Sequence, residues 1–236
     1  MQYSNIIFGK FIERPNRFVA VVEIEGQQEV VHVKNTGRCK ELLLPGSKVV
    51  LTEPQPPQSA SGQLPLMGSR AKRKTRYDLI GVWKKNLGWV NIDSQAPNKV
   101  VQEWLESGKS KFKKITFLKP EYTYGKSRID FYLEQGKKKI FIEVKGCTLE
   151  IDGVGYFPDA PTERGVKHLQ ELAAAKAEGY ECYLAFVIAM PKVTRVLPNV
   201  ATHPEFGTAL RMAQQAGVKV LYLPCEVKPG VIEIKS

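Results

Sequence analysis

The sequence has few of the residues that build zinc sites and disulfide frameworks. Only four of its 236 residues are cysteine and three are histidine, and the Cys-x-x-Cys spacing does not occur. Because structural zinc sites and disulfide-rich domains need closely spaced ligands, both classes are disfavoured. Cys182 and Cys225 lie in apolar runs. We expect them to be small core residues in a reducing cytoplasm.

Long apolar runs and a secretion signal are also missing. No run of about 18 apolar residues occurs, as a membrane-spanning helix would need. The opening Met1-Gln-Tyr-Ser-Asn has neither the basic region nor the apolar region of a signal peptide. We therefore expect a cytoplasmic protein with no membrane span.

Acidic residues are outnumbered by basic ones. The chain has 24 Asp and Glu against 35 Lys and Arg, which gives a net charge of +11. Such an excess predicts a polyanionic partner, nucleic acid first and an anionic membrane surface second. Since the sequence shows neither the pattern of a membrane span nor that of a signal peptide, we expect the membrane alternative to be the weaker one.

Turn residues and hydrophobic periodicity divide the chain into two units. From residue 5 to 51, short strand patterns alternate with turns in the manner of a small β-barrel or sandwich. Later segments add helices, one expected to start at an Asn98 cap and one at a Thr162 cap, and an apolar strand from Glu181 to Met190. The second unit is therefore predicted to be α/β with a mixed sheet.

The boundary between the units falls between residues 80 and 98, and we divide the chain into 1–81 and 82–236. Residues 52–71 are rich in Pro, Gln and Ser, and we interpret them as a mobile loop inserted between strands.

Two apolar runs, 127–133 and 139–146, predict a β-hairpin around Gly136. Strand side chains alternate, so Glu143 and Lys145 share one face of the second strand. If the turn comprises residues 135–138, Asp130 on the first strand lies directly opposite Glu143. Like charges opposed across a sheet repel, so something should compensate them, and a hard divalent cation is one candidate.

Asp130 followed by Glu143-Val144-Lys145 matches the Asp plus Glu-x-Lys arrangement of metal-dependent phosphodiesterases. Asp130, Glu143 and the backbone carbonyl of Val144 would supply oxygen ligands to Mg²⁺ or Mn²⁺. Lys145 would hold the attacking water and offset negative charge in the transition state. A solvated strand face with a cross-strand salt bridge fits the same residues, and the pattern alone leaves both interpretations open.

Other charged residues near this hairpin have two interpretations each. Glu121 is either a further carboxylate of the site or an exposed acid at a strand edge. Asp159 and Glu163 flank the start of the Thr162 helix, where capping and the helix dipole explain acidic residues. Three basic residues of that helix, Arg164, Lys167 and His168, either contact a phosphate backbone or form a solvated face.

A basic cluster at residues 70–76 includes Lys72, Arg73, Lys74 and Arg76, and three aromatic residues follow it: Tyr77, Trp83 and Trp89. Positive charges beside stacking rings are how small β-barrels hold nucleic acid. Alternatively, the rings belong to the core and the charges to a solvated loop end.

Several segments together resemble the sugar fermentation stimulation protein A family, nearly from end to end. The segments are 11–20, 35–38, 72–78, 127–131, 142–145, 155–160, 162–165 and 167–169. The resemblance implies an N-terminal OB-fold domain, a C-terminal domain similar to PD-(D/E)XK nucleases, DNA binding and an effect on sugar metabolism. By position, Asp130, Glu143 and Lys145 would form the nuclease-like triad, with Glu121 as an added acid.

Two departures from the family pattern accompany this resemblance. Residues 54–69 form an insertion where the family has a short loop, and Gly146-Cys147 replaces a bulkier pair after the lysine. The insertion would displace the basic cluster, and the small pair would alter the geometry beside the site.

We therefore expect a DNA-binding protein with a nuclease-like site for Mg²⁺ or Mn²⁺ that acts as a phosphodiesterase. One alternative is a non-catalytic DNA-binding regulator that keeps the site as a relic, and another is an RNA-processing factor. The oligomeric state stays open, with a homodimer among the arrangements allowed. The DNA contacts are assigned to ten basic residues: Arg14, Arg17, Arg38, Lys72, Arg73, Lys74, Arg76, Arg128, Arg164 and Lys167.

Overall fold

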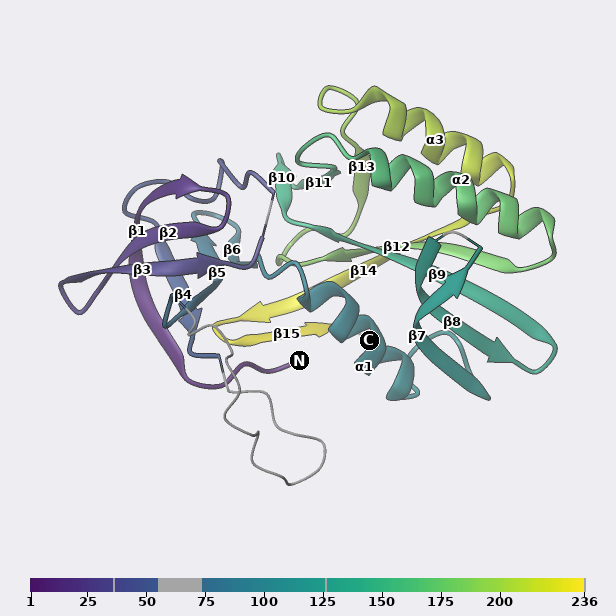
Figure 1. Ribbon diagram of the computed structural model, residues 1–236, viewed down its shortest axis with the longest axis horizontal. Helices are drawn as coiled ribbons and strands as arrows, with labels where there is room; N and C mark the ends of the chain where they lie inside the picture. Colours follow the sequence, from purple (N-terminus) through teal and green to yellow (C-terminus); the bar gives the residue numbers. More distant parts are fainter. Residues whose placement is uncertain (36, 55–73, 126, 236) are drawn as a thin grey trace.

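The first part of the chain is built of strands, several of which are joined by turns of two or three residues (Figure 1). The computed structural model describes residues 1–35, 37–54, 74–125 and 127–235. Its first six strands are β1 (Ile6–Asn16), β2 (Val19–Ile24), β3 (Gln27–Val33), β4 (Lys48–Thr52), β5 (Asp78–Lys84) and β6 (Gly88–Asn91). They form one sheet in the order β3-β2-β1-β4-β5-β6, and a parallel pairing of β3 with β5 closes it into a barrel.

A second six-stranded sheet, in the order β15-β14-β12-β9-β8-β7, forms the C-terminal part. β12 runs parallel to β9 and β14, whereas the other neighbours are antiparallel, so the sheet is mixed as predicted. Its strands are β7 (Phe117–Tyr124), β8 (Ser127–Gln135), β9 (Lys138–Cys147), β12 (Glu181–Ile188), β14 (Lys219–Lys228) and β15 (Val231–Ile234).

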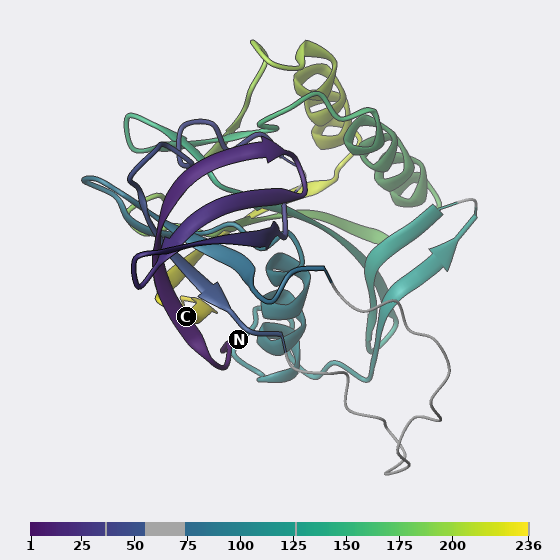
Figure 2. The same cartoon turned by 60° about the vertical axis from the view of Figure 1, so that its left-hand side comes forward.

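Three helices cover this sheet: α1 (Ala96–Glu106), α2 (Glu163–Ala177) and α3 (Pro204–Gln215). α2 and α3 lie together on one face and α1 lies on the other (Figure 1). In Figure 2 the barrel and the β7–β8 strands stand on either side of α1. Within the described ranges, none of the helices is both long and apolar enough to cross a membrane.

β12 carries the core between these two helical layers. Seven of its eight residues are buried, because helices cover both of its faces. All four cysteines are free and buried, which confirms the core positions predicted for Cys182 and Cys225.

The β8–β9 hairpin has the predicted register. Phe131 pairs with Ile142 and Gln135 with Lys138, so the connecting turn is Gly136-Lys137, and Gly136 takes the positive φ of 60° that a tight turn requires. One step beyond Phe131, Asp130 comes beside Glu143.

Several expectations change in detail. Asn98 is not a cap: α1 begins at Ala96 after Gln95, and Pro97 in the first turn starts the helix earlier than expected. A three-stranded sheet of β10 (Leu149–Ile151), β11 (Val154–Phe157) and β13 (Val196–Pro198) was not predicted. The predicted loop at 52–71 falls largely on residues 55–73, outside the described residues.

The division at residues 81 and 82 stays a prediction. Strand pairing within the barrel continues past it, because β6 pairs with β5 from Gly81–Asn91 to Lys84–Gly88. The first residues of the chain also reach the second sheet, where Gln2 bridges to Val231 of β15.

Candidate functional site

Asp130 lies on β8 at the point where it faces β9, and two donors hold its carboxylate. The Val144 amide donates to Oδ2 at 2.8 Å, and Asn98 Nδ2 of α1 donates to Oδ1 at 2.8 Å. Burial, and then the negative charge of Glu143, raise the pKa of Asp130 above its usual range. The two carboxylates therefore repel each other in the folded chain, as the register predicted.

Glu143 is 1% exposed and lies deeper than Asp130. Its Oε1 accepts a hydrogen bond from Lys145 Nζ at 2.6 Å and is also hydrogen-bonded to His168 Nδ1. Burial alone would raise the pKa of Glu143, but the His168 hydrogen bond and the Lys145 charge outweigh it and lower the pKa. Among the described residues, its buried Oε2 has no hydrogen-bond partner.

His168 is a buried member of the site that the sequence pattern did not identify. Arg164 Nε donates to His168 Nε2 at 3.2 Å, so the proton of a neutral His168 ring is assigned to Nδ1, which faces Glu143. α2 is fixed at its start by Thr162, whose Oγ1 accepts from the Gly165 amide at 3.0 Å. Arg164 and His168 are four residues apart on one helix face, which was the one available sequence signal.

The residues at the hairpin fit a hard divalent cation. Two carboxylates lie side by side, one with a free buried oxygen, and a cation would neutralise the repulsion that raises the pKa of Asp130. Within 1–35, 37–54, 74–125 and 127–235, no group of three or more His, Cys, Asp or Glu side chains could hold a metal. A bound ion would thus need further oxygens from the backbone, water or a phosphate, which is how Mg²⁺ is commonly held.

Glu121 stands apart from this cluster. It takes a positive φ of 51° on β7, its side chain is 63% exposed, and its Oε2 lies 3.5 Å from Arg128 Nη1. The role of Glu121 as an added acid of the site therefore stays a prediction, and its observed placement is closer to that of an exposed acid at a strand edge.

Gly146 explains one of the family departures. A Cβ at this position would lie 2.7 Å from Pro97 Cγ, so a residue without a side chain allows α1 to pack closely against the end of β9. This contact places Asn98, the next residue of α1, within reach of Asp130.

Arg14 has a structural role, because its guanidinium is hydrogen-bonded within the protein. Its guanidinium donates to the carbonyls of Gly37, Arg38, Arg17 and Asn35 at 2.6 to 2.9 Å. These bonds fix the loop after β3, so the donors that we assigned to DNA are engaged inside the protein.

The other predicted DNA contacts are mostly at the surface. Arg17, Arg38, Lys74 and Arg164 are exposed, and Lys72 and Arg73 lie outside the described residues. Three more are exposed but ion-paired, namely Arg76 with Glu53, Arg128 with Glu121 and Lys167 with Glu171.

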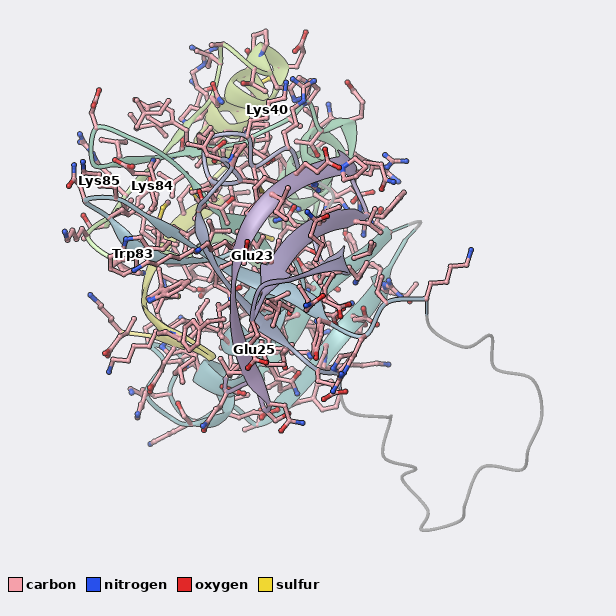
Figure 3. The ribbon with its side chains drawn as sticks, turned by 90° about the vertical axis from the view of Figure 1, so that its left-hand side faces the viewer. Glu23, Glu25, Lys40, Trp83, Lys84 and Lys85 are labelled. Carbon is pink, nitrogen blue, oxygen red and sulfur yellow. The ribbon has the colours of Figure 1, made fainter. Side chains whose placement is uncertain are left out.

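The outer face of the barrel has mixed charge. Figure 3 shows Glu23 and Glu25 over its middle, with Lys40, Lys84 and Lys85 toward its margins. Glu23 also pairs with Lys10 at 3.4 Å. This face is thus not a continuous basic surface.

The aromatic residues after the basic cluster divide between core and surface. Tyr77 is 7% exposed and belongs to the barrel core, whereas Trp83 is 44% exposed and meets Trp89 edge-on at a ring distance of 5.5 Å. The core interpretation holds for Tyr77 and fails for Trp83.

A cavity of about 490 Å³ lies where the barrel meets the second sheet. Its wall includes Arg17 and Asn35 from the barrel side and Asn98 and Val144 from the carboxylate site. It is therefore continuous with the residues that hold Asp130.

Comparisons with known proteins agree with this architecture. Residues 12–92 match the family model of the SfsA N-terminal OB domain, and residues 95–231 match that of the sugar fermentation stimulation protein RE domain. The chain belongs to the sugar fermentation stimulation protein family. The resemblance noted from the sequence is thereby confirmed, together with an OB-like barrel followed by a nuclease-like mixed-sheet domain.

Relatives in this family span nearly the whole chain. A sugar fermentation stimulation protein homolog from Desulfitobacterium hafniense is 53% identical over 233 residues, covering 99% of this chain and 95% of its own. One from Clostridium beijerinckii is 51% identical over 236 residues, covering 100% and 97%. A solved structure of Pyrococcus furiosus SfsA, in complex with Ca²⁺, matches with 28% identity and a TM-score of 0.84, covering 100% and 96%.

Proposed function

We propose that this chain binds DNA and hydrolyses its phosphodiester bonds with Mg²⁺ or Mn²⁺ held at Asp130, Glu143 and the Val144 carbonyl. One observation carries the proposal. The half-buried Asp130 carboxylate lies beside the buried Glu143 carboxylate, whose Oε2 has no hydrogen-bond partner among the described residues, and Lys145 lies next to both. When bound, the cation would polarise the phosphate and lower the pKa of a water nucleophile.

The chain's own residues would position this chemistry. Asn98 and the Val144 amide hold the Asp130 carboxylate, so its lone pairs keep one orientation. His168 holds Glu143 through Oε1, which leaves Oε2 for a ligand. Lys145 Nζ, 2.6 Å from Glu143, would orient the attacking water and offset charge that develops on the phosphate.

Two further observations support a divalent cation and DNA. The related Pyrococcus furiosus structure is of SfsA in complex with Ca²⁺, which prefers the same oxygen ligands as Mg²⁺. The net charge of +11 favours a polyanion, and the exposed Arg17, Arg38, Arg128 and Arg164 would meet phosphates. The four free cysteines suit the reducing cytoplasm, where we place the protein.

A second candidate function is a non-catalytic DNA-binding regulator of sugar metabolism. It is favoured by the internal bonding of the site: Lys145 is paired to Glu143, and both oxygens of Asp130 accept protein donors. Such a protein would bind DNA with the same salt dependence but would leave it intact.

DNA cleavage separates the two candidates. Supercoiled, linear and branched DNA would be incubated with Mn²⁺ and the wild type, Lys145→Met or Lys109→Met. Lys109 is exposed, pairs with Glu233 away from the hairpin and serves as a matched control. We expect cleavage by the wild type and the control and none by Lys145→Met; intact DNA in every lane would favour the regulator.

A further inference from the structure

The cavity between the barrel and the second sheet adjoins the proposed cleavage site. Asn98 and Val144 both line it and both donate to the Asp130 carboxylate at 2.8 Å. A phosphate held beside Asp130 would therefore place the nucleoside attached to it at the cavity.

The lining chemistry suits a neutral, hydrogen-bonding group. Among the described residues that line the cavity, Arg17 is the one Lys or Arg, and Asp93 and Asp159 are the acids. Asp93 is neutralised by Lys34 at 2.8 Å. With so little positive charge, the cavity does not suit a run of phosphates. Asn35 is bonded to the Ile92 carbonyl and the Gly37 amide, and Asn98 Nδ2 is bonded to Asp130, so Asn98 Oδ1 and the Thr148 hydroxyl are the groups that would read a nucleobase.

The cavity walls are held in place without a ligand. Arg14 fixes the loop around Gly37, and the Arg38 amide donates to Asp159 Oδ2 at 3.1 Å, which ties that loop to the second domain. A Cβ on Gly37 would collide with Asp159 Oδ2, so a larger residue there would push this carboxylate away from the Arg38 amide. Asn199 Nδ2 anchors the opposite wall at the Pro158 carbonyl, 3.0 Å away.

Its size limits the occupant. A volume of about 490 Å³ is that of a small-molecule site. A duplex is far too wide for it, since the major groove alone is about 12 Å across. A single nucleotide fits only after it leaves the base stack.

We infer that the cavity receives an unpaired nucleotide next to the scissile phosphate, so the substrate is DNA with an unpaired nucleotide and not continuous duplex. This inference rests on the proposed function. Extruding a paired base costs free energy that an unpaired base does not, which gives the preference its physical origin.

Binding measured without cleavage tests it. Affinities for a fully paired duplex and for the same duplex with one unpaired nucleotide would be compared by fluorescence anisotropy in Ca²⁺, which takes oxygen ligands, and gel analysis of the recovered DNA would verify that it stays intact. We expect the wild type to favour the unpaired form about tenfold or more. Ala160→Phe fills the cavity. It should bring the ratio of the two affinities, unpaired form to paired duplex, close to one, and should leave the affinity for the paired duplex and the uptake of Mn²⁺ unchanged. Thr208→Phe, a similar enlargement in the groove between α2 and α3, should behave as wild type.

A second measurement needs no variant. Millimolar deoxynucleoside monophosphate should abolish the wild-type preference while paired-duplex affinity stays the same. A wild-type ratio near one, or a preference that survives both Ala160→Phe and the mononucleotide, would overturn the inference. If the wild type bound neither DNA, the proposed function itself would fail.

Discussion

The Asp130 carboxylate is half-buried between α1 and β9, where its negative charge is unfavourable. Its pKa is raised in the folded chain, by burial first and by Glu143 second. For an acid, this sign means that ionisation destabilises the fold: the cost is absent below the unfolded pKa of about 3.9 and is complete once the pH exceeds the folded pKa.

Asp130→Asn should therefore leave the free energy of unfolding of the metal-free protein at pH 7 unchanged or raise it, by at most about 1 kcal/mol. Asn preserves the shape, and Asn98 can present its amide oxygen to the new amide. The difference in free energy of unfolding should shrink as the pH falls toward 4, which urea titrations at several pH values would measure. A clear loss of stability at pH 7 would show that the carboxylate is a favourable structural group.

His168 acts on the site through Glu143, as a positioning residue. Its Nδ1 faces Glu143 Oε1, and Arg164 occupies the other ring nitrogen. Loss of such outer partners usually lowers metal affinity roughly 10- to 100-fold. We expect His168→Ala to weaken Mn²⁺ binding by this factor.

The Asn and Gln variants of His168 supply the control. The amide of Asn occupies nearly the place of Nδ1, whereas that of Gln corresponds to Nε2. His168→Asn should recover most of the Mn²⁺ affinity in calorimetry and His168→Gln should not. Equal affinity in all three variants would show that His168 only fills space.

At the scale of elements, the β8–β9 hairpin was predictable because its information is local. Alternating apolar residues and Gly136 fix the register, and the register brings Asp130 beside Glu143. The same alternation places Lys145 near Glu143, where it is found at 2.6 Å.

The partners of the carboxylates were not predictable in this way. Asn98 lies 32 residues before Asp130, and His168 lies 25 residues after Glu143, so their approach depends on how helices pack on the sheet. β11 and β13 are three or four residues long and pair across about forty residues of chain. Strands this short carry too little periodicity to be recognised.

The loop after β3 is held by Arg14, whereas the neighbouring Arg17 is exposed and is proposed to contact DNA. Arg14→Gln removes most of four hydrogen bonds to carbonyls and should lower the free energy of unfolding by roughly 2 to 4 kcal/mol. Arg17→Ala removes an exposed side chain and should change stability little.

DNA binding should show the reverse pattern. Arg17→Ala should weaken binding and reduce the slope of log affinity against log salt by about one, the value for one lost phosphate contact. Denaturation and binding curves of the two variants provide the comparison. An unchanged slope in Arg17→Ala, or unchanged stability in Arg14→Gln, would reverse the assignment.

At the scale of the whole molecule, positive charge is spread over both domains. The exposed Arg17 and Arg38 belong to the barrel, whereas Arg128 and Arg164 belong to the second domain. DNA affinity should therefore fall steeply between about 50 and 200 mM salt, because each phosphate contact releases a counterion. Filter binding at four salt concentrations would measure the slope, and a flat dependence would contradict an electrostatic DNA surface.

Asp130 and Glu143 are proposed to share one divalent cation. Calorimetric titration of the wild type and Asp130→Asn with Mn²⁺ would detect this ion, since the substitution removes the charge while the fold is kept. We predict saturable uptake of one ion per chain by the wild type and none by Asp130→Asn. No uptake by the wild type, or equal uptake by both proteins, would contradict the claim.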